Sequence, residues 1–180
     1  TGEDTLSLHD ALPICQWSGL SLAVGLSLAE SLHPDVQLKW PNDLWRQGKK
    51  LGGILIEAST QGQQSYAVIG VGLNIQLPIT ADLRTPPAAL CEFWEGVTAP
   101  QALERLAAPL MASLQTFETD GFVPLQQRFD QRDALKGQPI TTSDEQQGLC
   151  LGVDAQGALQ MSTENGMILI NTSEVSVRPL

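Results

Sequence analysis

Residues 36–58 read VQLKWPNDLWRQGKKLGGILIEA, and this stretch decides the fold class. Val36 to Trp40 alternates apolar and polar residues as a strand does, and the run from Leu51 to Ala58 is apolar enough for a second strand. Pro41-Asn42-Asp43 can turn the chain, and Gln47-Gly48-Lys49 precedes the second run. Parallel strands need a crossover of about a dozen residues or more, so these short connections predict antiparallel pairing.

The segments on either side extend this pattern. From Leu20 to Leu32, apolar residues recur at three- and four-residue spacing until Pro34 ends the pattern, which predicts a buried helix backing the sheet. A third apolar run, Tyr66 to Leu77, follows a polar turn and predicts a third strand. Residues 78–100 are rich in Pro, Thr and Ala, so we expect a long connection with little regular structure.

The remainder of the chain changes character. Helical spacing predicts a helix from Pro100 to about Thr119 and a shorter one from Val123 to about Leu135. From Gly137 onward, short apolar runs between turn signals predict four or five strands, for which a small SH3-like β-barrel is the most plausible arrangement. The expected fold is α+β: a mixed, largely antiparallel sheet backed by helices, followed by the small barrel.

Composition narrows the function classes. The chain has 180 residues and is 42% hydrophobic, which is enough for a real core. Ten Lys and Arg against twenty Asp and Glu give a formal charge of −10, so we expect no nucleic-acid partner for this portion. Three widely separated cysteines suggest neither disulfides nor a zinc site, and the longest apolar stretch is too short for a bilayer. We therefore expect a cytoplasmic protein with no membrane segment.

The first residues, TGEDTLSLHDALPIC, show no clear helical or strand period and do not connect with the pattern that follows. We interpret residues 1–16 as a non-native leader and leave them out of the functional argument. The rest then divides into a larger domain over residues 17–136 and a C-terminal β domain over residues 137–180.

Three motifs follow one another along the chain: Lys39-Trp40-Pro41-Asn42-Asp43, Lys50-Leu51-Gly52-Gly53-Ile54-Leu55-Ile56-Glu57 and Gly70-Val71-Gly72-Leu73-Asn74. In order and spacing they resemble the biotin protein ligases, also called biotin–[acetyl-CoA-carboxylase] ligases. Each motif alone is a modest signal, but the three in register are highly specific. The likeness extends from about Gly19 to Leu180.

This resemblance implies that residues 17–136 are part of a class II synthetase-like biotin/lipoate ligase domain. It implies a reaction in which biotin and ATP, with Mg²⁺, give biotinyl-5′-AMP and pyrophosphate. Biotin then passes to one lysine of biotin carboxyl carrier protein, the carrier of acetyl-CoA carboxylase. In this family an exposed sheet edge serves for homodimerisation or, alternatively, for docking the carrier by strand pairing.

Joining a carboxylate to the α-phosphate of ATP requires a fixed cation, because both groups are anions and more charge develops as pyrophosphate leaves. Lys39 is the candidate catalytic residue and, as the family lysine does, would contact both biotin and ATP. The ordinary alternative for a lysine at a strand end is a solvated surface pair.

Glycines inside strands weaken a sheet unless a bulge, a close neighbour or a ligand requires them. Biotin's fused rings need a flat apolar wall, and Gly53, Leu55, Gly70 and Gly72 are the candidate biotin contacts. Helix-to-sheet packing is the competing explanation.

Asn42 and Asn74 are candidate ATP contacts by resemblance, although each also suits an ordinary turn. Asp43 would organise its loop or an outer-shell magnesium water. Lys49 and Lys50 fit a solvated hairpin charge pair better than a phosphate contact. Trp94 would either cover adenine or anchor its loop.

Two alternatives stay open. A lipoate or octanoate transferase has a similar catalytic domain, but the K-W-P-N-D and G-G-I-L-I-E motifs and the C-terminal β domain argue against it. A non-catalytic biotin-binding fragment of a biotin-responsive repressor is the rival from another class. The family's glycine/arginine-rich loop belongs before residue 17 and is not found, so the chain as written is not expected to complete catalysis efficiently.

Overall fold

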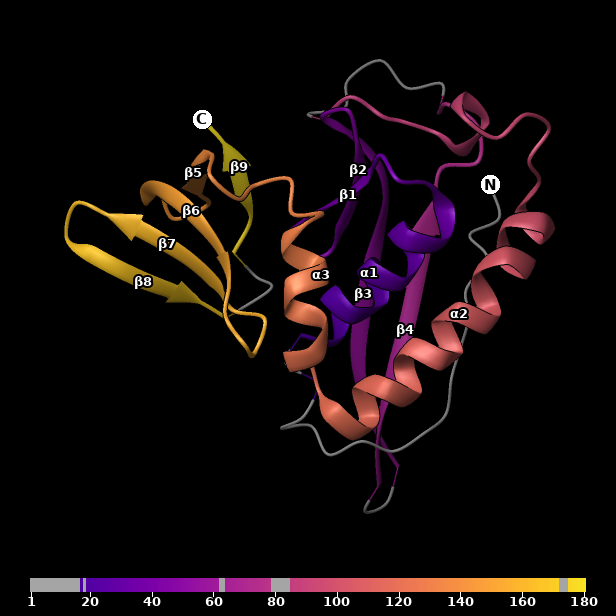
Figure 1. Cartoon of the computed structure of the whole chain (residues 1–180), viewed down its shortest axis with the longest axis horizontal. Helices are drawn as coiled ribbons and strands as arrows, with labels where there is room; N and C mark the ends of the chain where they lie inside the picture. Colours follow the sequence, from indigo (N-terminus) through magenta and orange to yellow (C-terminus); the bar gives the residue numbers. More distant parts are fainter. Residues whose placement is uncertain (1–16, 18, 62–63, 79–84, 172–174) are drawn as a thin grey trace.

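The computed structural model describes residues 17, 19–61, 64–78, 85–171 and 175–180. Helices cover one face of a four-stranded sheet, and a second, smaller sheet lies beside it (Figure 1). The segment interpreted as a leader, residues 1–16, lies outside the described residues.

Helix α1 spans Leu20–Leu32, as its apolar spacing predicts. It is buried over almost its whole length and packs against the sheet on one side and a second helix on the other. Gly25 permits the close approach to the sheet, since a Cβ there would lie 2.9 Å from Leu38 Cδ2 and 3.2 Å from Ile54 Cδ1.

The first sheet has the order β1-β2-β3-β4, with every neighbouring pair antiparallel. Its strands are β1 (Val36–Lys39), β2 (Asp43–Arg46), β3 (Lys49–Gln61) and β4 (Gln64–Leu73). Strand β2 lies where the sequence indicated only turns, and β4 ends earlier than Leu77 because Asn74 turns away to bond Leu51 and Leu90. The expected antiparallel pairing is confirmed. The parallel pairing expected of a mixed sheet is present only as isolated bridges.

The connection after β4 contains the short 3₁₀ helix η2 (Leu90–Glu92), and α2 (Ala99–Asp120) follows. The next expected helix is shorter than its pattern suggests: η3 (Val123–Leu125) leads into α3 (Gln126–Asp130). It stops there because the backbone after it pairs with β1, where Leu38 N donates to Arg132 O and Ala134 N donates to Leu38 O. Neither α1 nor any other described helix combines the length and apolar character needed to cross a bilayer.

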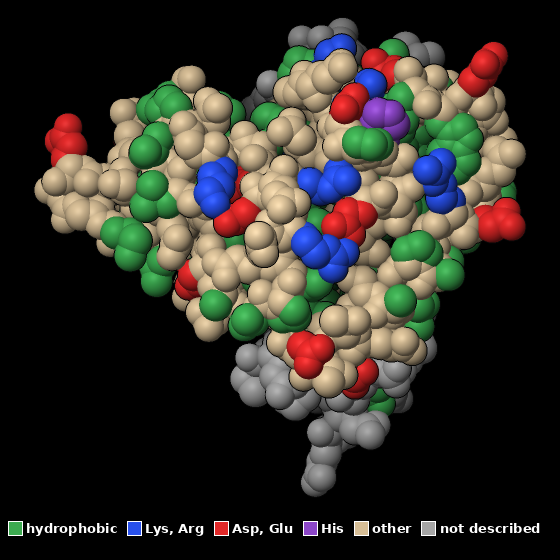
Figure 2. Space-filling view, in the orientation of Figure 1, with side chains coloured by type: hydrophobic (Ala, Val, Ile, Leu, Met, Phe, Trp, Pro, Cys, Tyr) green, Lys and Arg blue, Asp and Glu red, His purple; other side chains and the backbone are tan. Residues whose placement is uncertain are grey.

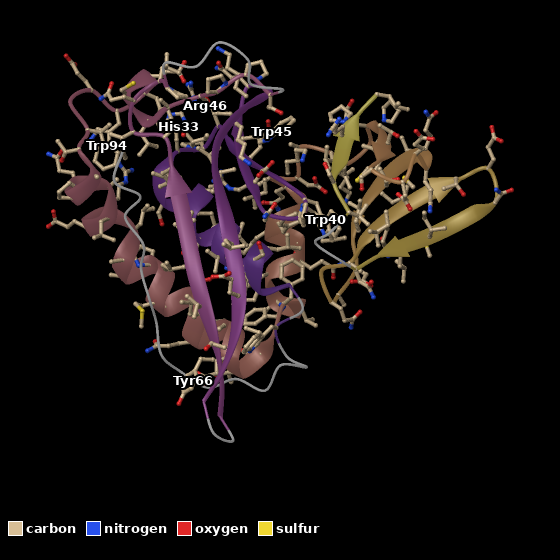
Figure 3. The ribbon with its side chains drawn as sticks, turned by 180° about the vertical axis from the view of Figure 1, so that it is seen from behind. His33, Trp40, Trp45, Arg46, Tyr66 and Trp94 are labelled. Atoms are coloured by element: carbon tan, nitrogen blue, oxygen red, sulfur yellow. The ribbon has the colours of Figure 1, made fainter. Side chains whose placement is uncertain are left out.

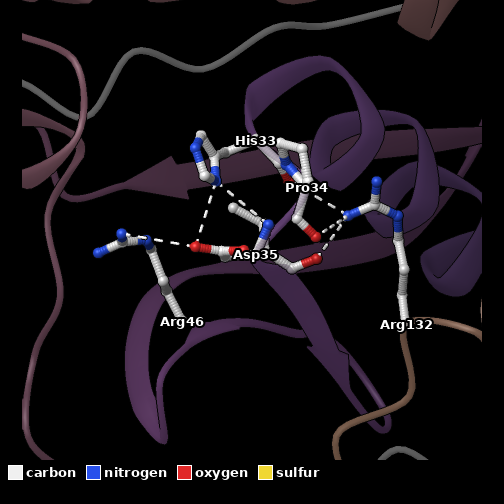
Figure 4. A network of polar contacts seen from close by, with 6 residues as sticks. His33, Pro34, Asp35, Arg46 and Arg132 are labelled. Atoms are coloured by element: carbon white, nitrogen blue, oxygen red, sulfur yellow. Dashed lines mark hydrogen bonds and ion pairs between the residues drawn. The ribbon is translucent and has the colours of Figure 1, made fainter.

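Arg132 strengthens this attachment. Its Nη1 donates to three carbonyl oxygens, those of His33, Pro34 and Val36, at 3.2, 3.1 and 2.8 Å (Figure 4). The chain leaving α3 is therefore fixed to the segment that enters β1, so the second sheet begins from a defined position.

The second sheet contains five antiparallel strands in the order β8-β7-β6-β5-β9. They are β5 (Pro139–Thr142), β6 (Gln147–Val153), β7 (Leu159–Thr163), β8 (Gly166–Ile170) and β9 (Val177–Pro179). The strand content expected from Gly137 onward is present. No closed barrel is found, because the outer strands β8 and β9 do not pair with each other in the described part of the chain.

The two parts meet beside the K-W-P-N-D segment. Trp40 lies between the two sheets (Figure 3), and its Nε1 donates to Gly157 O at 3.0 Å. Gly157 has φ +82°, and a Cβ on it would come within 2.8 Å of Gly19 Cα, so this turn approaches the start of α1 as closely as a glycine allows. Gln126 Nε2 adds a bond to Val153 O at 2.7 Å.

Candidate functional site

A single row of paired residues crosses the first sheet. Lys39 lies opposite Asp43, Asp43 opposite Gly53, and Gly53 opposite Gly72. Residues paired across antiparallel strands share a face. Their neighbours along the strands point the other way, into the core with α1: Leu38, Leu44, Ile54 and Val71. The row therefore faces away from the helices, on the sheet face that no described helix covers (Figure 3).

This face differs in charge from the helical one. On the helical face, basic and acidic side chains are interspersed and no basic patch forms (Figure 2). On the site face, the ammonium groups of Lys39, in the row, and of Lys50, beside it, both lie next to the carboxylate of Asp43. The excess of positive charge suits an anionic ligand.

Lys39 is the most buried charged group of the site, at 8% exposure. Its Nζ lies 3.5 Å from Asp43 Oδ2 and 5.5 Å from the ring centroid of Trp45. Burial lowers the pKa of Lys39, and the carboxylate of Asp43 opposes that lowering without cancelling it, while the like charges of Lys50 and Arg178 lower the pKa further. An anion bound at Lys39 would favour the charged form and raise the pKa again.

Asp43 is the shared partner of the two lysines. Its Oδ1 lies 2.6 Å from Lys50 Nζ, and its side chain is 15% exposed against 44% for Lys50. The sequence predicted a charge pair for Lys50, and a pair is present, but it lies on the site face beside Lys39. Arg178, from β9, contributes a further positive charge to this region.

The glycines of the motifs fall into two kinds. Gly52 is required by packing, because a Cβ there would overlap the carbonyl oxygen of Gly72 and lie 2.8 Å from Leu73 Cδ2. Gly53, Gly70 and Gly72 carry no such requirement, since a Cβ on any of them would meet nothing nearer than 3.6 Å.

Leu55, opposite Gly70, is 59% exposed on the same face. Together with Gly53, Gly70 and Gly72 it forms what we call the glycine wall: two adjacent cross-strand pairs on the site face in which the only side chain is that of Leu55. A flat apolar surface of this kind, next to cationic groups, suits a ring system that carries an anionic tail.

The two asparagines support the backbone around the row. Asn42 Nδ2 donates to Ile54 O at 2.8 Å, and Ile54 N donates back to Asn42 O at 2.9 Å. Asn74 Nδ2 donates to Lys50 O at 3.2 Å and to Ala88 O at 2.9 Å. Both side chains therefore hold β3 in place, and any nucleotide contact would be an additional role.

Of two tryptophans, sequence reasoning singled out Trp94 and missed Trp45. Trp94 lies beneath the guanidinium of Arg105, 4.8 Å from its ring centroid, and stands apart from Trp45 and Trp40 (Figure 3). Trp45 was not singled out, yet it lies beside Lys39 and opposite Lys50. The alternation of Asp43–Arg46, which makes β2, was the available signal.

The described residues do not fit a resident metal centre. They hold no group of three or more His, Cys, Asp or Glu side chains placed to bind one ion. The carboxylate of the row, Asp43, is already engaged by two lysines.

Comparisons with known proteins identify the family of this chain. The sequence model described as the "Biotin/lipoate A/B protein ligase family" matches residues 7–74, which includes all three motifs. The biotin–[acetyl-CoA-carboxylase] ligase of Paracoccus denitrificans is 32% identical over 167 residues, covering 88% of this chain and 70% of that protein. The chain belongs to the biotin protein ligase family.

Two further comparisons concern one relative in sequence and one solved structure of similar fold. The bifunctional ligase/repressor BirA of Escherichia coli is 33% identical over 177 residues, which cover 89% of this chain and 53% of that protein. The chain thus spans about half the length of BirA. The apo biotin protein ligase of Aquifex aeolicus has the same fold, with a TM-score of 0.81 at 24% identity over 93% of this chain and 77% of that chain.

Proposed function

We propose that this chain is the part of a biotin protein ligase that activates biotin with ATP and presents it for transfer to biotin carboxyl carrier protein. The single observation that carries the proposal is the row in which Lys39, Asp43 and the glycine wall share one face of the sheet. A protein of the same fold from Aquifex aeolicus is known in complex with biotin and ATP, so this fold accommodates both ligands.

In the first step, a carboxylate oxygen of biotin attacks the α-phosphorus of ATP. A bond forms between that oxygen and phosphorus, the bond to the β-phosphate oxygen breaks, and its electron pair leaves with pyrophosphate. Lys39 is the fixed cation for this step: it is buried and held in place by Asp43. A preorganised charge in a partly dehydrated position stabilises the developing anion more strongly than one in water.

We assign the glycine wall to the biotin rings and the polar groups beside it to the nucleotide. Gly53, Leu55, Gly70 and Gly72 offer a flat surface next to Lys39, which would bring the biotin carboxylate to the cation. Asn42 lies just before β2 and Asn74 just after β4, and we assign both to ATP, which enters as its magnesium complex. For Asn74 the contact would use the amide oxygen, because its nitrogen already donates to two carbonyls.

In the second step, the amine of a carrier-protein lysine displaces AMP from biotinyl-5′-AMP and forms an amide. Adenylate is a good leaving group, whereas the free carboxylate of biotin is a poor acyl donor. We place this reaction in the cytoplasm, where carboxylase carriers would be available. We also propose that the outer edge of β4, which no described strand pairs, serves a partner by strand addition, the partner being the carrier in turnover and a second copy of the chain in a homodimer.

We propose a division at about residue 137 and an SH3-like barrel for the C-terminal part. The supporting observation is the strand order, a meander whose last strand, β9, returns to pair with its first, β5. The missing step to a closed barrel is pairing between β8 and β9.

The deciding experiment is biotin-dependent exchange of labelled pyrophosphate into ATP, performed on the intact gene product that contains residues 17–180. Lys39→Ala is expected to reduce exchange by about 10²- to 10³-fold, the usual cost of removing one preorganised charge. Lys49→Ala is the matched control: Lys49 is exposed and makes no ion pair with the described residues, so its loss should leave exchange unchanged. A folded wild-type protein without biotin-dependent exchange would refute the ligase function.

A further inference from the structure

A β-bulge between β2 and β3 determines where Lys50 points. Leu44 pairs with Gly52, but the next residue of β2, Trp45, pairs with Lys50, so Leu51 is the extra residue of β3. Strict alternation from Gly53 would turn Leu51 outward and Lys50 into the core. The bulge reverses this: Leu51 is fully buried, and Lys50 reaches Asp43 on the site face.

The backbone of Lys50 is fixed from three sides. Its amide donates to Pro86 O at 2.9 Å, and its carbonyl accepts from Ala88 N at 2.8 Å and from Asn74 Nδ2 at 3.2 Å. The bulge is therefore held by the chain after β4 as well as by the sheet. A solvated hairpin lysine would need none of this support.

The side chain of Lys50 lies along the glycine wall. A Cβ on Gly53 would come within 3.6 Å of both Cε and Nζ of Lys50. Asp43 Oδ1 holds the same Nζ at 2.6 Å, yet the side chain remains 44% exposed. The backbone of Lys50 is thus fixed, while its charged ammonium group can still reach a ligand in the solvent-facing part of the site.

We infer that Lys50 is the second cation of the site and that it binds the phosphate chain of the nucleotide. This inference rests on the proposed function. Lys39, which is buried, serves the two groups that become joined, and Lys50, which is half exposed, serves the β- and γ-phosphates that depart as pyrophosphate. Asp43 is the positioning residue, because each of its two carboxylate oxygens lies beside one of the ammonium groups.

The test is calorimetric binding of MgATP, of pyrophosphate and of biotin to the intact gene product and to three variants. Lys50→Met should weaken MgATP and pyrophosphate binding by about ten- to a hundredfold, as the loss of a charged hydrogen bond does, and leave the Kd for biotin within about twofold. Lys50→Arg should restore most of the MgATP affinity. Lys49→Met, one residue away and exposed, is the matched control and should bind all three ligands as the wild type does.

A purely structural role for Lys50 predicts a different pattern. Unchanged MgATP binding in a folded Lys50→Met variant, or equal losses for biotin and MgATP, would overturn the inference while leaving the ligase function standing. A wild-type protein that binds neither biotin nor MgATP would refute the proposed function itself. If Lys50→Met does not fold, Lys50→Gln decides the question, because glutamine can still donate to Asp43 without carrying the charge.

Discussion

The indole Nε1 of Trp40 donates a 3.0 Å hydrogen bond to the carbonyl oxygen of Gly157, a residue 117 positions later in the chain. Trp40 directly follows Lys39, and Gly157 lies in the turn between β6 and β7. This buried bond ties the C-terminal sheet to the end of the strand that carries Lys39, the residue we propose as the catalytic cation.

Trp40→Phe removes that donor and leaves the Gly157 carbonyl buried without a partner. Trp45→Phe is a matched comparison, because the buried Nε1 of Trp45 has no hydrogen-bond partner among the described residues. We expect Trp40→Phe to lower the free energy of unfolding by about 1–3 kcal/mol more than Trp45→Phe does, measured by urea denaturation. Equal losses in the two variants would show that the bond contributes nothing beyond packing.

The glycines of the second motif should separate stability from binding. Gly52→Ala forces a Cβ against the backbone of Gly72 and is expected to destabilise the fold by roughly 2 kcal/mol or more. Gly53→Ala meets no close neighbour, so its thermal unfolding should match the wild type or rise slightly. Because the added methyl group projects from the glycine wall, Gly53→Ala should weaken biotin binding in calorimetry. Wild-type biotin affinity in that variant would argue against the wall as the ring site.

Asp133 should make the free energy of unfolding larger at acid pH than at neutral pH. Burial raises its pKa from 3.8 to about 6, with a hydrogen bond from Leu135 N partly opposing the rise. The folded state therefore holds a proton that the unfolded chain has already lost. The contribution of Asp133 to the free energy of unfolding is fully present below pH 3.8 and is lost as pH rises to about 6. The loss is about 3 kcal/mol at most.

Urea denaturation between pH 3.5 and 7 measures this effect. Asp133→Asn should flatten the profile between about pH 4 and 6, while Asp120→Asn, at the exposed end of α2, should keep the wild-type slope. Parallel profiles for the wild type and Asp133→Asn would rule out the assigned proton.

The main role of the Asn74 side chain should be to hold the backbone at Lys50 and Ala88 in place. Asn74→Ala leaves the carbonyls of Lys50 and Ala88 without their side-chain donor. We expect a loss of about 1–3 kcal/mol in stability and faster amide hydrogen exchange at Ala88 and Leu90, whose amides bond Lys50 O and Asn74 O. Unchanged exchange at both amides would instead leave a ligand contact as the main role of Asn74.

The sequence predicted the parts of the fold that depend on local periodicity. Helix α1 was predicted with its bounds because Leu20–Leu32 carries an uninterrupted helical pattern and Pro34 stops it. Strand β2 was missed because four residues between two turns are too few for a period to stand out. The early end of α3 depends on a contact between Leu38 and the 132–134 segment, which local sequence does not reveal.

For the site, the sequence likewise predicted some residues and not others. The motifs identified Lys39 and the glycines, and the structure brings them into one row with Asp43. The position of Lys50 could not be predicted, because the alternation of side chains along β3 is broken by a bulge that only the register with β2 defines. The sequence also could not show that Asp43 serves two lysines at once.

The pairing of β9 with β5 fixes the order in which this chain can assemble during synthesis. Residues 177–179 supply the strand beside β5, and Val177 covers the same interior as Ile140. While the ribosome still holds those residues, β5 keeps an open edge and the second sheet lacks one side of its core. The K-W-P-N-D segment is therefore translated well before β9, the strand that completes the sheet bonded to Trp40.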